Sequence, residues 1–180
     1  MTSSAKATFD SAIKDAEDLL AHFDNLNSSP PPATAEVLKR AGLIMALTAW
    51  ETYVEDCVLG IVTARTNSAG DSLEKRFLLK HLESELRRFN TPNVEKTQKL
   101  FQDYLGIDVV KGWQWNNYDA DRAKQELNDL VKKRGEAVHR AKAPTTGISA
   151  PHLIRRDELE KAIRFLKSLV DATERALNGI

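Results

Sequence analysis

Apolar residues recur at helical spacing along almost the whole chain, and no stretch alternates apolar and polar residues as a half-buried strand would. Breaks rich in proline, glycine or asparagine separate the periodic segments. The spacing predicts helices over about residues 4–25, 34–65, 72–88, 94–105, 120–141 and 156–178. We therefore expect an all-α fold, a bundle of about five to six helices in a single domain spanning residues 1–180.

The apolar stripe over residues 34–65 is the broadest, as expected for the central helix of a bundle. Its predicted core residues are Val37, Leu38, Ala41, Ile44, Met45, Trp50, Tyr53, Val54, Cys57, Val58 and Ile61. The segment 72–88 is expected to bury Leu73, Phe77, Leu78, Leu82 and Leu86. The segment 120–141 is expected to bury Ala123, Leu127, Leu130, Val131 and Val138. Asp119 is predicted to cap the start of that last helix, and Gly106 to end the helix over 94–105.

Composition argues against several classes of protein. The 26 basic and 26 acidic side chains cancel, which argues against a protein that coats nucleic acid through bulk charge. Cys57 is the single cysteine, so we expect neither a disulfide framework nor a cysteine-based zinc site. Charged residues interrupt both the N-terminal segment and the most apolar stretch, residues 43–62. We therefore expect no signal peptide, no membrane span and a cytoplasmic location.

One short segment, KKRGEAVHRAK at residues 132–142, departs from the balanced charge of the chain. It combines five cations with one acid and one histidine: Lys132, Lys133, Arg134, Arg140 and Lys142, with Glu136 and His139. Cations near a helix C-terminus commonly compensate the helix dipole and contact solvent. The alternative is that Arg134 and His139 form a catalytic pair. Arginine binds phosphate through a planar fork, and histidine transfers protons near neutral pH.

The spacing of the pair does not by itself separate the two interpretations, because the sequence holds a second match. Arg76 and His81 stand in RFLLKH, within an apolar part of the helix predicted over 72–88, so we interpret His81 as a packing or boundary residue. The surroundings of Arg134 and His139 differ. Cations flank them near the end of their predicted helix, and a loop and one last amphipathic helix follow.

In that setting, RGEAVH resembles the marker of the HEPN superfamily, an arginine followed after four to six residues by a histidine. Further segments are similar to the RiboL-PSP-HEPN branch and occur in its order: ALTAWETYVEDCV, NVEKTQKLFQDYLGID with WQWNN, and ISAPHLIRRDELEKAIRFL. The resemblance covers residues from about 36 to 178 and implies a HEPN-like helical bundle. Many HEPN nucleases carry a polar residue directly after the arginine, where this sequence has Gly135.

The resemblance implies a metal-independent endoribonuclease, often a toxin or antiviral effector restrained by an antitoxin or another regulatory partner. In such an enzyme His139 would transfer protons, Arg134 would hold the phosphate and Glu136 would position one of them, without metal or cofactor. Cleavage would use the 2′-hydroxyl of the RNA as nucleophile. One chain offers one suitable imidazole for two proton transfers, so we expect a homodimer that shares the site. The expected RNA contacts are Lys132, Lys133, Arg140 and Lys142.

Glu51 is a carboxylate beside Trp50 on the otherwise apolar helix over 34–65. It is expected either at the edge of the helix, in an ion pair, or as a supporting acid that orients an arginine or histidine of the site. Glu55 stands one turn further along the same face.

Three aromatic residues, Trp113, Trp115 and Tyr118, stand in the irregular stretch before residue 120. We expect them to anchor the end of the bundle, with stacking on unpaired bases as the alternative. For the whole chain, the alternative function is a non-catalytic HEPN-like RNA-binding or protein-interaction module, which Gly135 and the neutral net charge favour.

Overall fold

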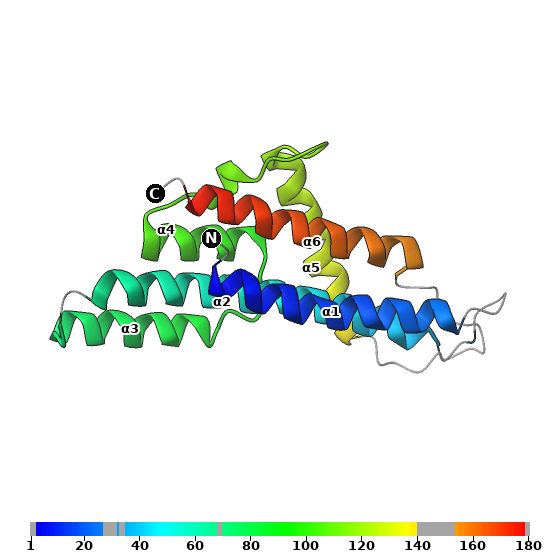
Figure 1. Cartoon of the computed structure of the whole chain (residues 1–180), viewed down its shortest axis with the longest axis horizontal. Helices are drawn as coiled ribbons and strands as arrows, with labels where there is room; N and C mark the ends of the chain where they lie inside the picture. The colour runs from blue at the N-terminus through cyan, green and yellow to red at the C-terminus, as the bar shows by residue number, and fades with distance from the viewer. Residues whose placement is uncertain (1–2, 27–31, 33–34, 68–69, 140–153, 179–180) are drawn as a thin grey trace.

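The computed structural model describes residues 3–26, 32, 35–67, 70–139 and 154–178. Within these ranges the chain forms six α-helices and one short 3-10 helix (Figure 1): α1 (Ser4–Asn25), α2 (Glu36–Thr66), α3 (Leu73–Leu86), α4 (Val94–Leu105), η3 (Val109–Gly112), α5 (Ala120–His139) and α6 (Arg156–Leu177). The helices coincide closely with the segments expected from the apolar spacing, and the all-α fold is confirmed.

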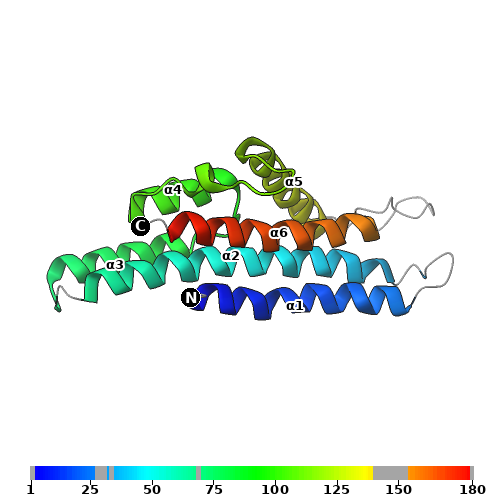
Figure 2. The ribbon, with the colours of Figure 1, turned by 45° about the horizontal axis from the view of Figure 1, so that its top comes forward.

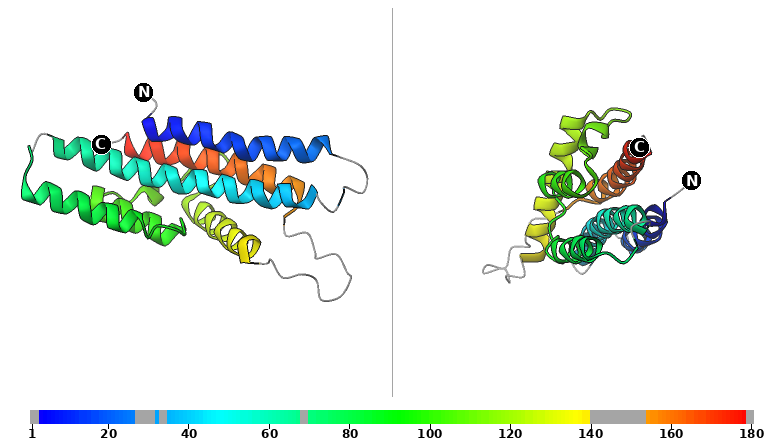
Figure 3. Two further views of the ribbon diagram at one scale, coloured as in Figure 1. Left: turned by 90° about the horizontal axis from the view of Figure 1, so that it is seen from below. Right: turned by 90° about the vertical axis from the view of Figure 1, so that its left-hand side faces the viewer.

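Helix α2 is the centre of the molecule, because it packs against α1, α3, α4, α5 and α6. Helices α1, α2 and α6 run side by side along the long axis, and α3 lies beside the C-terminal half of α2 (Figure 2). Helix α5 crosses this arrangement at a steep angle, which Figure 3 shows as the inclined yellow helix. The expected central position of α2 is therefore confirmed.

The helix ends follow local capping rules. The side chains of Ser3, Ser72, Asn93 and Asp119 each accept a hydrogen bond from the backbone N–H three residues later. Gly106 ends α4 in the left-handed conformation, with φ of 74°, which a residue without Cβ adopts at little cost. The predicted caps at Asp119 and Gly106 are confirmed.

The predicted core residues of α2 from Trp50 to Val58 are buried, whereas those before Trp50 are not. Tyr53, Val54 and Val58 are buried as expected, but Val37 is 52% exposed. The buried residues of the first half are instead Lys39, Gly42, Leu43, Ala46, Leu47 and Ala49. Both α1 and α6 pack against α2, so the buried surface spreads around the helix and does not follow one narrow stripe.

Burial predictions in α3 and α5 are also partly wrong. Leu82 is the buried residue of α3, whereas Leu73 is 72% and Phe77 70% exposed. Near the end of α5, Val138 is 51% exposed, although Ala123 and Leu127 are buried as expected. Helix α3 packs mainly against α2, so it has one buried side, and the apolar residues on its other sides contact solvent.

The irregular segment before α5 is anchored by Trp113, as expected. Its side chain is fully buried and its Nε1 donates a hydrogen bond to Thr173 Oγ1 at 3.0 Å, in α6. The ring also lies edge-on to Trp50 of α2, with centroids 6.1 Å apart. Trp115 and Tyr118 are partly exposed. Trp113 therefore fixes the position from which α5 starts.

Candidate functional site

Arg134 points from α5 toward α2 because of the way α5 is packed. Leu127 and Leu130 are buried, and Arg134 follows Leu130 by one turn on the same face. The guanidinium therefore continues the inner face of the helix. The Arg134 side chain is 21% exposed, which places it at the border between core and solvent.

The guanidinium of Arg134 is held by two groups from distant parts of the chain. Its Nη1 donates to Glu51 Oε2 at 3.0 Å and to the Asn90 carbonyl oxygen at 3.3 Å. The Glu51 side chain is only 18% exposed, so water screens this ion pair less than a surface pair. Sequence reasoning left Glu51 open between an edge residue and a supporting acid. Both interpretations include an ion pair, and the structure identifies its cation as Arg134.

The segment that carries the Asn90 carbonyl is itself fixed between α2 and α5. The buried Trp50 donates through Nε1 to the Pro92 carbonyl at 3.1 Å, and Asn128 Oδ1 of α5 accepts from the Val94 backbone N–H at 3.2 Å. With the bond from Arg134, three hydrogen bonds hold residues 90–94. Asn90 was missed by sequence reasoning, because a residue that acts through its backbone carbonyl leaves no side-chain pattern to find.

A second carboxylate, Glu55, lies one turn beyond Glu51 on α2. Burial, together with the neighbouring charges of Glu51 and Asp56, raises the pKa of Glu55 to about 7. The carboxyl group of Glu55 therefore changes its charge near neutral pH, close to the acid that binds Arg134.

The structure describes the side chains of three of the other predicted site residues. Lys133 binds Glu158 of α6 through Nζ at 3.3 Å, Lys132 is exposed, and Glu136 is half-buried. His139 is the last residue of α5, and its side chain lies outside the described part of the structure. The remaining two predicted RNA contacts, Arg140 and Lys142, also lie outside the described residues.

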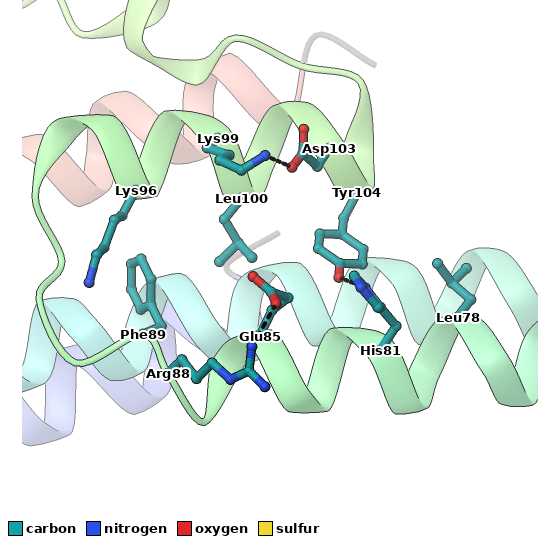
Figure 4. Close-up of a pocket in the computed structure, with 10 residues that line it drawn as sticks. All are labelled: Leu78, His81, Glu85, Arg88, Phe89, Lys96, Lys99, Leu100, Asp103 and Tyr104. Carbon is teal, nitrogen blue, oxygen red and sulfur yellow. Dashed lines mark hydrogen bonds and ion pairs between the residues drawn. The ribbon is translucent and has the colours of Figure 1, made fainter.

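The second Arg–His match has different surroundings. Arg76 is 65% exposed and pairs with Asp71 at 3.6 Å, on the surface of α3. His81 is exposed and its Nδ1 lies 2.6 Å from the hydroxyl of Tyr104 in α4 (Figure 4). The two residues do not share a contact that the structure describes, so this match is not assembled in the way that Arg134 is.

The groove that contains His81 has a volume of about 660 Å³ and lies between α3 and α4. Its charged side chains largely pair with one another: Arg88 with Glu85, and Lys99 with Asp103 (Figure 4). His81 also stacks on the exposed ring of Phe77, with centroids 6.3 Å apart. His81 is therefore a surface residue that bridges two helices. The expectation that His81 packs in the core or at its boundary is wrong, because the residue is exposed.

Among the described residues, no group of three or more His, Cys, Asp or Glu side chains is arranged to hold a metal ion. No helix in the described ranges combines the length and the apolar character needed to cross a bilayer.

Comparison with known proteins gives one finding. The model of the RiboL-PSP-HEPN family matches residues 11–179, which is nearly the whole chain and includes Glu51, Asn90, Arg134 and His139. No curated protein and no solved structure matches the sequence significantly.

Proposed function

This chain belongs to the RiboL-PSP-HEPN family, and on that premise we propose that it is a metal-independent endoribonuclease whose site combines Arg134 and His139 of two protomers. The observation that carries the proposal is the position of Arg134. Its guanidinium is half-buried, is held by Glu51 and the Asn90 carbonyl, and stands on the helix that ends at His139.

The two contacts of Arg134 leave part of its binding capacity for a phosphate. Both contacts use Nη1, whereas a guanidinium has five N–H donors in one plane. The edge formed by Nε and Nη2 carries three donors that these contacts do not use. A phosphate oxygen pair fits such an edge through two parallel hydrogen bonds. Glu51 therefore orients the group while the opposite edge binds substrate.

The proposed reaction needs two proton transfers and no metal. The imidazole of His139 removes the proton from the 2′-hydroxyl, whose oxygen then forms a bond to the adjacent phosphorus. The bond from phosphorus to the 5′-oxygen breaks, and the partner's His139 donates a proton to that oxygen. Arg134 stabilises the charge on the phosphorane-like transition state. The products end in a 2′,3′-cyclic phosphate and a 5′-hydroxyl.

A symmetric dimer explains how one kind of imidazole serves as both base and acid. On a regular helix, residues 134 and 139 point in directions about 140° apart, so one chain does not aim both at one atom. A two-fold axis beside the end of α5 brings a second arginine and a second histidine into the same cleft. Val138, 51% exposed on the last turn, supplies apolar surface for that contact. In the cell we propose a toxin or defence role under the control of an antitoxin or other regulatory partner.

The test is RNA cleavage by purified protein in the presence of EDTA, with analysis of the product ends. We expect 2′,3′-cyclic phosphate termini from the wild-type protein and no products from His139→Ala with an unchanged unfolding temperature. His81→Ala is the matched control and should cleave normally. Full activity of His139→Ala contradicts the proposal. If the wild-type protein binds RNA but leaves it intact, the chain is instead a non-catalytic binding module.

The dimer has its own test. Analytical ultracentrifugation at micromolar protein should give the mass of two chains for the active species. An active monomer contradicts the shared site, whatever the chemistry.

A further inference from the structure

A second groove lies between the loop before α5 and the outward face of α6, and its volume is about 980 Å³. Its lining combines aromatic rings with cationic side chains from α5 and α6. We propose that this groove binds an unpaired stretch of the RNA substrate outside the cleavage site. The proposal rests on the proposed function for the identity of its ligand, and it adds a substrate-binding surface that Arg134 and His139 do not provide.

The aromatic part of the groove is a small stacked cluster. Trp115 and Tyr118 lie with ring centroids 4.8 Å apart and planes 21° from parallel, and both rest on Phe165 at 5.7 and 5.4 Å. Asn117, with φ of 67°, makes the tight turn that brings the two rings together. Phe165 is buried and forms the floor, whereas Trp115 and Tyr118 are partly exposed. Part of their ring surface therefore remains open to an unpaired base.

Two arginines of the groove bind backbone carbonyl groups and not carboxylates. Arg122 Nη1 donates to the Asn117 carbonyl at 2.7 Å, and Arg175 Nη2 donates to the Gln114 carbonyl at 3.1 Å. These bonds position both guanidinium groups without neutralising them, because a carbonyl carries no net charge. The Arg122 guanidinium also lies over the Tyr118 ring, 4.8 Å from its centroid.

Two more cations line the groove, Lys161 and Arg164 of α6, against one lining acid, Glu126. Lys161 is paired with Asp157 at 3.3 Å. The described lining still has more positive than negative side chains, although the chain as a whole has a net charge of zero. A local excess of cations beside exposed rings favours a polyanion with flat bases over an apolar ligand.

The α6 residues that line the groove begin near a contact between α6 and α5. The positions 161, 164, 168 and 175 share one face of α6, and this row begins one turn beyond Glu158. Glu158 binds Lys133, the residue next to Arg134. Residues 158–175 extend along about 26 Å of helix, which matches about seven stacked nucleotides. In this proposal, the strand that is cleaved at Arg134 continues along this face of α6 and passes the aromatic cluster on Phe165.

The experiment measures binding of a 2′-O-methyl RNA of about ten unpaired nucleotides by fluorescence anisotropy at several salt concentrations. This probe lacks the attacking hydroxyl, so binding is measured with the intact wild-type chain and does not depend on cleavage. Arg164→Glu with Arg175→Glu should weaken binding about tenfold or more. The slope of log affinity against log salt should fall by about 1.4, the contribution of two phosphate contacts to a single strand. Lys14→Glu with Lys80→Glu makes the same change in net charge on α1 and α3 and should leave binding within about twofold of wild type.

The contribution of the rings is tested with an abasic oligonucleotide of equal length and charge, which should bind several-fold more weakly than the RNA probe. Equal effects of the two double variants, or equal binding of the abasic strand, overturn the proposal. Absence of binding by the wild-type protein overturns it as well. If a poly-glutamate peptide of the same charge competes as well as RNA, the groove recognises acidic protein and the proposal is wrong. If the protein binds RNA in the groove as expected but does not cleave it, only the proposed cleavage is contradicted.

Discussion

Arg134 Nη1 lies 3.0 Å from Glu51 Oε2, and this contact joins α5 to the central helix at the border of the core. The two residues are 83 positions apart in the sequence. Each residue of the pair is about one-fifth exposed, which makes the contact more than a surface ion pair and less than a buried one. The contact leads to two separate predictions, one for the stability of the fold and one for the proposed reaction.

The first prediction concerns stability. Arg134→Met leaves the Glu51 carboxylate half-buried without its cation, so it should destabilise the fold more than the double variant Arg134→Met with Glu51→Gln. Urea unfolding of the two single variants and the double variant should give a coupling free energy of about 1–2 kcal/mol. Strictly additive effects would contradict an energetic link between the two side chains.

The second prediction concerns catalysis. Glu51→Gln keeps the size of the side chain and an acceptor oxygen but removes the charge that orients Arg134. If Glu51 is a positioning residue, kcat should fall about ten- to a hundredfold with little change in KM. Glu55→Gln, one turn away on α2, is the matched control and should keep kcat within about twofold. A rise in KM alone would show that Glu51 affects RNA binding and not the position of the guanidinium during the reaction.

The third prediction concerns Gly135. Within the described part of the chain, a Cβ at this position would meet no atom within 4 Å, and Gly135 lies inside α5. Gly135→Ala should therefore raise the free energy of unfolding by about 0.5–1 kcal/mol, because alanine loses less backbone entropy than glycine in a helix.

Gly112→Ala is the contrasting control for Gly135. A Cβ there would lie 2.6 Å from the Cβ of Ala176, so the same substitution should destabilise the protein. Chemical denaturation measures both variants. Equal effects of the two substitutions would contradict the close approach of Gly112 in η3 to Ala176 in α6.

The fourth prediction concerns pH. The pKa of Glu55 is raised from 4.5 to about 7, so the folded state holds this proton more tightly than the unfolded state. Between pH 4.5 and about 7, the Glu55 carboxyl group is ionised in the unfolded chain but protonated in the folded chain. The stability that this group contributes is therefore lost as the pH rises through this range.

Glu55→Gln should consequently stabilise the protein at about pH 8, by roughly 1 kcal/mol because the carboxyl group is partly solvated. It should have little effect below about pH 4.5, where both forms of the wild-type chain are protonated. Thermal unfolding at a series of pH values measures this difference. A gain that is independent of pH would show that the glutamine stabilises α2 for another reason.

The helices were predictable because their signals are local. Caps such as Asp119 and Gly106 act within one turn, and the buried residues of α1, Phe9 and Ile13 among them, recur at helical spacing in the sequence. Burial in α3 was not predictable in the same way. The spacing of Leu73 and Phe77 indicates a helix, but it does not say whether a neighbour covers that side.

The candidate site was also predictable only where its signals are local. The arginine and histidine could be selected from a short segment and its context, and a carboxylate on an apolar helix marked Glu51 as unusual. That Glu51 binds Arg134, and that the Asn90 carbonyl completes the contact, depends on how α5 crosses α2. Such long-range contacts follow from the packing of whole helices and not from any local pattern.

The origin of the two groups that hold Arg134 has a consequence for a chain that is still on the ribosome. Residues 51 and 90 emerge well before residue 134, so most of the bundle is already synthesised when the guanidinium can first find its acceptors. A truncated translation product that stops before α5 contains the acceptors alone. The order of synthesis thus delays assembly of this arginine's surroundings until α5 itself has been made.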